Sequence, residues 1–280
     1  MFAFLETRAL PGVEVVDRSG YERLIASTDG GTPGWLRVAP WPGGEHALRL
    51  ELHGVPPTRL LDVVGRVRRM FDLDADPATI AATLSTSPVL RPLLRKRPGL
   101  RLPSAWDGFE LAVRAILGQQ VSVAAARTLA TRIAQRFGTP LESPPAPGLT
   151  HLFPEPQALA DADLAGIGLT RARADTVRGV ARALLDGRVD FRAERTLADF
   201  VARWTALPGI GDWTAHYIAM RALGHPDAFP ADDLVLRRAV AGDGAPPTAR
   251  ALTTIAEAWR PWRAYAVIHL WRNATPRTPA

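Results

Sequence analysis

The first hundred residues alternate between apolar and polar positions in short stretches. Leu48, Leu50 and Leu52 alternate with Arg49 and Glu51, a period of two that is typical of a half-buried β-strand. Turn residues such as those of 29–34 and 40–44 separate the stretches. The pattern predicts four strands: Phe2–Thr7, Tyr21–Ser27, Gly34–Ala39 and His46–Leu52.

The period changes to that of a helix after these strands. From Thr58, a residue that suits a helix N-cap, apolar residues recur at helical spacing through Leu61, Val64, Val67 and Phe71. We therefore expect an antiparallel sheet with a helix on one face.

Strand signals disappear beyond a basic, proline-containing connector from Arg91 to Pro103. Phe109, Val113 and Ile116 share one helical face, and five prolines within 139–154 predict a loop. Further helices are expected around 129–137 and over 171–186, 196–206, 212–223, 233–241, 248–258 and 261–272. The chain is thus predicted to be α+β, with an N-terminal α+β domain over 1–98 and a helical region over 99–280.

Composition excludes several classes of protein. The 280 residues are 47% hydrophobic, which excludes a wholly disordered chain. The absence of cysteine excludes disulfides, thiol catalysis and cysteine-held zinc or iron–sulfur clusters. No apolar run approaches the ~20 residues needed to span a bilayer, and the start of the chain does not resemble a signal peptide. We expect a cytoplasmic protein.

The charge balance is basic. The 34 Lys and Arg exceed the 28 Asp and Glu, giving a net charge of +6, and Lys96 is the only lysine. A basic excess suits a polyanionic partner such as nucleic acid. A genome that favours arginine codons explains the same composition equally well.

A glycine-containing segment between two expected helices is the most specific feature. Leu207–Gly211 reads Leu-Pro-Gly-Ile-Gly and precedes Asp212-Trp-Thr-Ala-His-Tyr217. Without side chains at Gly209 and Gly211, a phosphate group can approach the backbone N–H groups, and the next helix presents its positive end there. The segment predicts a phosphate-binding hairpin, although an isolated Gly-x-Gly is common in ordinary helix-to-helix turns.

Two adjacent carboxylates, Asp232 and Asp233, follow Phe229-Pro-Ala and precede an apolar helical pattern. Either can be a helix N-cap, which contributes about 1 kcal/mol, and spacing alone favours this interpretation. A carboxylate held at the start of a helix also has a fixed direction, which suits the stabilisation of positive charge.

These motifs, taken together and in order, resemble the HhH-GPD DNA glycosylase superfamily and, within it, the DNA-3-methyladenine glycosylase II (AlkA) type. Residues 207–238 resemble its helix-hairpin-helix, Gly/Pro-rich loop and aspartate. Three further stretches agree, at 71–73, 113–123 and 259–271, so the resemblance covers almost the whole chain. It implies a TATA-binding-protein-like N-terminal α+β domain and two helical subdomains that flank the active cleft.

The resemblance places the catalytic aspartate on Asp233, with Asp232 as the alternative if the register shifts by one. It implies excision of bases alkylated at a ring nitrogen. Such a base is already cationic, so it can leave without a strong general acid. Positive charge then develops on the sugar, and a preorganised carboxylate stabilises it. Lyase-competent relatives use a lysine where this chain has Trp213, so we expect an abasic site and an uncut strand.

Reaching the glycosidic bond requires flipping the nucleotide out of the duplex. A cationic base is best held by aromatic faces. Trp213 and Tyr217, at i and i+4, share a helix face, and the resemblance adds Trp271 as the third pocket aromatic. Core packing is the simpler interpretation of aromatic residues at helical spacing, and we adopt it for Trp204, Trp259 and Trp262.

The resemblance implies further contacts. Gln120 matches the residue that fills the space left by the flipped base, although a polar surface residue in a turn is the alternative. Gly209, Ile210 and Gly211 are expected to bind the DNA backbone. The main-chain carbonyls of Thr205, Leu207 and Ile210 match those that hold a structural monovalent cation, and no other cofactor is expected.

The expected partner is double-stranded DNA with alkylated bases, bound by a bacterial monomer that does not contact membranes and that meets the nucleoid through DNA. Two other functions stay open. One is a glycosylase of the same fold for another damaged base. The other is a non-catalytic helix-hairpin-helix DNA-binding protein, against which the aspartate argues.

Overall fold

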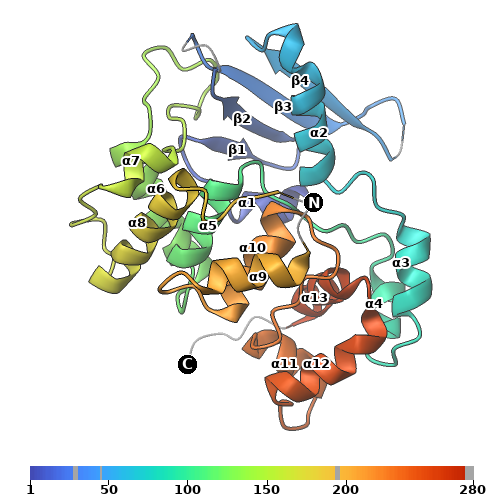
Figure 1. Ribbon diagram of the computed structural model, residues 1–280. Helices are drawn as coiled ribbons and strands as arrows, with labels where there is room; N and C mark the ends of the chain where they lie inside the picture. Colours follow the sequence, from blue (N-terminus) through green and yellow to red (C-terminus); the bar gives the residue numbers. More distant parts are fainter. Residues whose placement is uncertain (28–30, 45, 193–195, 275–280) are drawn as a thin grey trace. The chain divides into compact units, whose positions relative to one another are not determined.

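The computed structural model describes residues 1–27, 31–44, 46–192 and 196–274 (Figure 1). The chain forms two compact units, each built from two segments: Met1–Gly65 with Phe109–Arg188 (unit 1), and Arg66–Gly108 with Val189–Ala280 (unit 2). The domain boundary expected at residue 98 stays a prediction. Asp29 and Gly30 of the expected turn lie outside the described residues.

A four-stranded antiparallel sheet lies in unit 1, with strand order β1-β2-β3-β4. On its buried face, Val38 pairs with Tyr21 on one side and with Leu50 on the other. Val38 and Tyr21 are fully buried. The period-two pattern therefore predicted three strands correctly. The four strands are β1 (Glu14–Val16), β2 (Tyr21–Ile25), β3 (Gly34–Pro40) and β4 (Leu48–His53).

The prediction of a strand over Phe2–Thr7 is wrong, because this segment forms the short helix α1 (Phe2–Glu6). Leu5 is buried, and the Arg8 guanidinium lies 3.8 Å from the centre of the Phe4 ring. So short an apolar run cannot distinguish a period of two from 3.6. The first strand is β1 instead, whose three residues are too few for an alternation to be visible.

The remaining described elements are helical, and the helices expected in the C-terminal part are confirmed to within a few residues. Thr58, the predicted N-cap, lies instead inside a 3₁₀ turn (Pro57–Arg59) ahead of α2. The helices are α2 (Leu60–Met70), α3 (Pro77–Leu84), α4 (Arg91–Lys96), α5 (Gly108–Leu117), α6 (Val123–Phe137), α7 (Pro156–Ala160), α8 (Arg171–Leu185), α9 (Leu197–Thr205), α10 (Asp212–Ala222), α11 (Leu234–Ala241), α12 (Ala249–Ala256) and α13 (Arg263–Asn273), with a second 3₁₀ turn at Glu257–Trp259.

Besides α1, three of the described helices were not predicted: α3, α4 and α7. Each has a proline in its first turn. Proline interrupts a helix interior, but it is favourable at the first helical position, where its missing N–H has no partner to lose. The segment from Arg91 to Pro103, predicted to be a connector, therefore begins with α4.

A buried charged cluster joins the sheet of unit 1 to α5. Glu110 on α5 pairs with Arg23 on β2 and accepts a hydrogen bond from Arg114 at 2.8 Å. Arg114 also donates to Glu14 on β1 at 3.0 Å. Burial acts to raise the pKa of Glu110, but the attraction of Arg23 and Arg114 outweighs it and lowers that pKa below its ordinary value. The cluster therefore keeps its charges when buried.

Two of the tryptophans assigned to packing do form the core of unit 2. Trp204 and Trp259 are each 1% exposed. The Trp204 ring lies 5.4 Å from Phe200, and Trp259 meets Phe229 edge-on at 6.0 Å. The third, Trp262, is half-buried and contacts Tyr265 edge-on.

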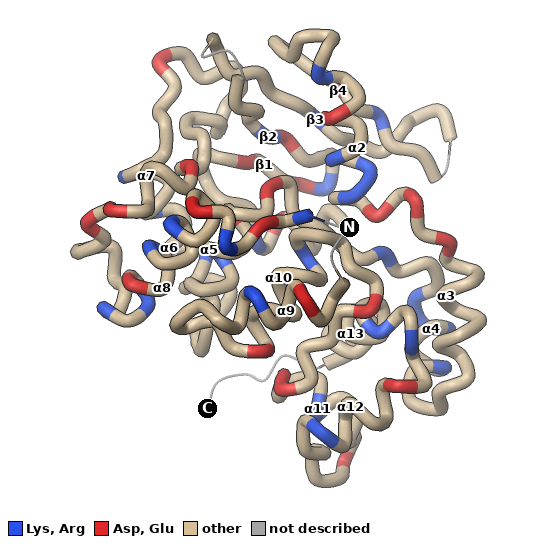
Figure 2. The backbone as a smooth tube through the Cα atoms, viewed as in Figure 1, with Lys and Arg blue, Asp and Glu red and all other residues tan. Residues whose placement is uncertain are grey.

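Basic and acidic positions are interspersed along the described backbone (Figure 2). Basic residues do end several helices, such as Arg68 and Arg69 on α2 and Arg95 and Lys96 on α4. Cations at a helix C-terminus interact favourably with the helix dipole. Part of the arginine content is thus explained by helix stability.

Candidate active site

The predicted hairpin connects α9 to α10 and exposes its backbone. Pro208, Gly209 and Gly211 are exposed, whereas Leu207 and Ile210 are 6% and 4% exposed. The N–H of Ile210 donates to the Leu207 carbonyl at 3.1 Å and closes the turn. The side chains of Leu207 and Ile210 therefore pack inward.

The two hairpin glycines have different conformations. Gly209 has φ +85°, in the left-handed region that favours glycine. Gly211 has φ −90° and is the N-cap residue of α10, with no side-chain cap for the first helical N–H groups. A Cβ added at Gly211 would meet no described atom within 4 Å. The N-terminal end of α10 therefore has no capping side chain, and its first turn carries the carboxylate of Asp212.

Asp233 is the N-cap of α11 and is half-buried, whereas Asp232 is exposed. The Oδ1 of Asp233 accepts a hydrogen bond from the backbone N–H of Leu236 at 2.8 Å. Its Oδ2 accepts a second one from the indole Nε1 of Trp213 at 2.9 Å. Asp233 is thus the carboxylate that lies beside the predicted pocket aromatics, and its catalytic role stays a prediction.

The three predicted pocket aromatics are neighbours in unit 2. Trp213 and Tyr217 stack with ring centroids 5.1 Å apart and an interplanar angle of 7°. Tyr217 contacts Trp271 of α13 at 6.2 Å and 48°. All three are half-buried, unlike the core residue Trp204. They form an accessible aromatic wall that ends at the Asp233 carboxylate.

Arg221 supports this wall and was not predicted. It lies one helical turn after Tyr217 and donates to the tyrosine hydroxyl at 3.2 Å. Arg221 is 4% exposed, and its Nε donates to the carbonyl of Pro103. The i, i+4 spacing of an aromatic residue and an arginine was the available sequence signal.

The loop before Asp233 is held by contacts that the sequence did not reveal. The N–H of Phe229 donates to Nδ1 of His216 on α10 at 3.2 Å. Burial lowers the pKa of His216, which keeps Nδ1 free to accept. Asp227 accepts from Arg263 Nε and Nη2 on α13 at 2.7 and 2.8 Å. The loop is therefore fixed to α10 and α13.

Gln120 belongs to unit 1 and lies in the turn between α5 and α6. It is exposed and has φ +57°, an uncommon conformation for a residue with a side chain. Arg173 on α8 donates to the carbonyl of Gln119 at 2.7 Å, and the Ser122 hydroxyl caps α6. The predicted role of Gln120 in DNA stays a prediction.

Comparison with known proteins identifies the family. Residues 1–107 match the AlkA N-terminal domain, and residues 113–264 match the HhH-GPD superfamily base excision DNA repair protein. The chain belongs to the HhH-GPD superfamily. The resemblance inferred from 207–238 and the three other stretches is confirmed, as is the α+β fold class.

Two relatives resemble this HhH-GPD chain over nearly its full length. It is 36% identical to DNA-3-methyladenine glycosylase 2 of Escherichia coli, covering 97% of this chain and 92% of that protein. It is 40% identical to the "Probable bifunctional transcriptional activator/DNA repair enzyme AlkA" of Mycobacterium tuberculosis, again over 97% of this chain. The chain spans about half of that longer protein, 53%.

Solved structures share the HhH-GPD fold. The 3-methyladenine DNA glycosylase of Archaeoglobus fulgidus has a TM-score of 0.80 and 26% identity, covering 97% of this chain and 92% of that one. Mag1 of Schizosaccharomyces pombe has a TM-score of 0.59 and 23% identity, covering 69% and 95%, which supports the fold alone.

The hairpin carbonyls of the HhH-GPD chain have the chemistry of a site for a hard cation, which prefers oxygen ligands. Thr205 is the last residue of α9, where carbonyls lack intrahelical partners. The Leu207 carbonyl accepts one hydrogen bond, from Ile210, and keeps a second lone pair. These carbonyls and that of Ile210 therefore fit the expected monovalent cation, which stays a prediction.

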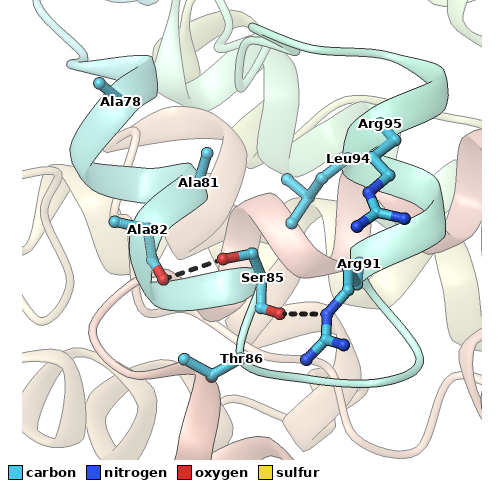
Figure 3. Close-up of a pocket in the computed structure, with 8 residues that line it drawn as sticks. All are labelled: Ala78, Ala81, Ala82, Ser85, Thr86, Arg91, Leu94 and Arg95. Carbon is cyan, nitrogen blue, oxygen red and sulfur yellow. Dashed lines mark hydrogen bonds between the residues drawn. The ribbon is translucent and has the colours of Figure 1, made fainter.

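A separate pocket of about 680 Å³ lies in unit 2 between α3 and α4 (Figure 3). Alanine methyl groups and Leu94 line it together with Arg91 and Arg95, and the Arg91 Nε donates to the Ser85 carbonyl at 2.9 Å. Its lining contains neither a carboxylate nor an aromatic ring, so it lacks the groups that base excision requires.

Among the described residues, no cluster of His, Asp and Glu forms a metal site, and no helix is long and apolar enough to cross a bilayer.

Proposed function

We propose that this protein is a monofunctional DNA glycosylase for alkylated bases, including 3-methyladenine and 7-methylguanine, in double-stranded DNA. One observation carries the proposal: the Asp233 carboxylate lies at the end of the wall formed by Trp213, Tyr217 and Trp271. A cationic base suits the aromatic wall, and the positive charge that develops on its sugar suits the carboxylate.

The reaction needs few groups. The N-glycosidic bond breaks with both electrons going to the base, which thereby becomes neutral. The oxocarbenium character of the sugar is stabilised by Asp233, which also orients a water molecule. Water adds to the sugar carbon and releases a proton, so the products are the free base and an abasic site in an intact strand.

DNA is the proposed partner, and the hairpin is its backbone clamp. The exposed backbone of Gly209 and Gly211, before the N-terminal end of α10, would meet a phosphate. The relatives support this partner, because they are 3-methyladenine glycosylases and Mag1 was solved in complex with abasic DNA. The carbonyls of Thr205, Leu207 and Ile210 would hold a monovalent cation, whose positive charge would attract the DNA phosphate. The protein acts as a cytoplasmic monomer that reaches the nucleoid through DNA.

The test is base release from duplex DNA methylated with dimethyl sulfate, analysed by chromatography. The wild type releases 3-methyladenine and 7-methylguanine, and Asp233→Asn does not. Parallel duplexes containing 8-oxoguanine or hypoxanthine reveal a glycosylase for other damaged bases. DNA binding without release of any base overturns the enzymatic proposal in favour of a DNA-binding module.

A further inference from the structure

We propose that Trp213, besides stacking, is a positioning residue that orients the Asp233 carboxylate through its indole N–H. The inference rests on the proposed function, because it assigns the orientation of the carboxylate that opposes positive charge on the sugar. The contacts that fix the aromatic wall then also fix the Asp233 carboxylate.

The carboxylate of Asp233 is held at both oxygens by donors from two different helices. Oδ1 accepts from the N–H of Leu236 on α11 at 2.8 Å, and Oδ2 accepts from Trp213 Nε1 on α10 at 2.9 Å. One hydrogen bond alone leaves a carboxylate free to rotate about its terminal torsion, which is broad. Two donors on different oxygens fix its plane.

The indole is itself fixed. Trp213 stacks nearly parallel to Tyr217, and the Tyr217 hydroxyl accepts from the buried Arg221. Arg221 in turn donates to the Pro103 carbonyl. These contacts all lie within unit 2. The series from Arg221 through Tyr217 and Trp213 therefore determines where the donor meets Asp233.

An indole donor is not needed for packing or stacking in this chain. The Nε1 of Trp204 is buried and has no hydrogen-bond partner among the described residues, although the Trp204 ring packs between Phe191 and Phe200. A phenyl ring at 213 would keep an aromatic face toward Tyr217 but has no N–H. The N–H of Trp213 thus holds the Asp233 carboxylate, which a ring without a donor cannot do.

The experiment compares two DNA duplexes that differ in one charge. One contains a pyrrolidine abasic analogue, whose protonated nitrogen mimics the cationic sugar, and the other contains a neutral tetrahydrofuran analogue. The ratio of their dissociation constants measures the electrostatic effect of Asp233. We expect the wild type to prefer the cationic analogue by on the order of 10- to 100-fold, as for one charge-assisted contact.

Trp213→Phe should reduce this preference at least about 5-fold, because the carboxylate loses a charge-assisted donor. Binding of the neutral duplex should fall less than binding of the cationic duplex, because the neutral analogue has no charge for the carboxylate to attract. In the Asp233→Asn background the preference is absent, and adding Trp213→Phe should change nothing further. Trp262→Phe is the matched control, since it removes an indole from the same unit outside the site.

If Trp213→Phe weakens both duplexes equally, Trp213 is only a wall residue and the inference is wrong. If the variant fails to bind either duplex, Trp213 is replaced by 3-benzothienylalanine instead. In this residue sulfur replaces the N–H in a ring of nearly the same shape, so the replacement tests the donor without changing the packing. Retention of the full preference in that protein overturns the inference. A wild type that releases no base and shows no preference contradicts the proposed function itself.

Discussion

The carboxylate of Asp233 caps α11 by accepting the backbone N–H of Leu236 at 2.8 Å. Asparagine caps a helix about as well as aspartate does. A change to Asn therefore removes the charge and keeps the cap, which makes the catalytic role of Asp233 separable from its structural one.

Asp233→Asn should lower base release from methylated duplex DNA by on the order of 100- to 1,000-fold or more, because electrostatic stabilisation of the sugar cation is lost. DNA affinity and melting temperature should change little. Asp232→Asn is the matched control, since its side chain is exposed. Loss of activity in Asp232→Asn alone would move the catalytic assignment by one residue.

The two hairpin glycines should respond differently to alanine. Gly211→Ala should fold normally, since space is open around its Cβ, yet bind duplexes of any sequence on the order of 10-fold more weakly. Gly209→Ala should also cost about 1 kcal/mol of stability, because φ is +85°. Fluorescence anisotropy across a salt series measures the binding, with Gly179→Ala as the control. Salt-independent binding would contradict a phosphate clamp.

Borohydride added during turnover should trap no covalent protein–DNA adduct. Trapping requires an amine that forms a Schiff base with the sugar. By the resemblance drawn from the sequence, Trp213 stands where lyase-competent relatives have a lysine, and Lys96 is the only lysine side chain in the sequence. Gel electrophoresis should show an intact strand until alkali is added. Strand cleavage without alkali is the result that excludes a monofunctional enzyme.

Glu110→Ala should destabilise the protein by about 3–5 kcal/mol, because the buried Arg23 would lose its closer carboxylate and keep only the more distant Glu14, 3.5 Å away. Glu22→Ala, which removes the more exposed pair with Arg37, should have a much smaller effect. Urea unfolding measures both. Equal effects would show that the buried cluster contributes nothing special to unit 1.

The free energy of unfolding should fall as the pH is lowered from about 6.5 to 4. Burial, with a further effect from Arg97, lowers the pKa of His269 to about 4, against about 6.5 in an unfolded chain. The unfolded chain therefore binds a proton that the folded protein does not bind, at a cost of about 3 kcal/mol by pH 4. His216 and His225 act in the same direction. In urea unfolding, His269→Gln should show a shallower decline than the wild type over this range.

Local patterns determined most of the architecture. Alternation predicted β2, β3 and β4, because one buried sheet face imposes a period of two. The segments around Leu207–Gly211 and Asp233 gave the hairpin, the capping carboxylate and the family resemblance. The same local reasoning failed at α1 and β1, which are too short for a period, and at α3, α4 and α7, where proline starts a helix instead of ending one.

The sequence by itself determined which residues could form a site: two carboxylates, a glycine hairpin and aromatic residues at helical spacing. The tertiary structure decided which carboxylate turns toward the aromatic wall and which tryptophans are core. Trp204 and Trp213 look alike in sequence, yet one is 1% exposed and the other donates to Asp233. Trp271 joins the wall from α13, and Pro103 accepts a hydrogen bond from Arg221, although both lie far from Tyr217 in the chain. Such contacts depend on how helices pack, because packing joins residues that no local period relates.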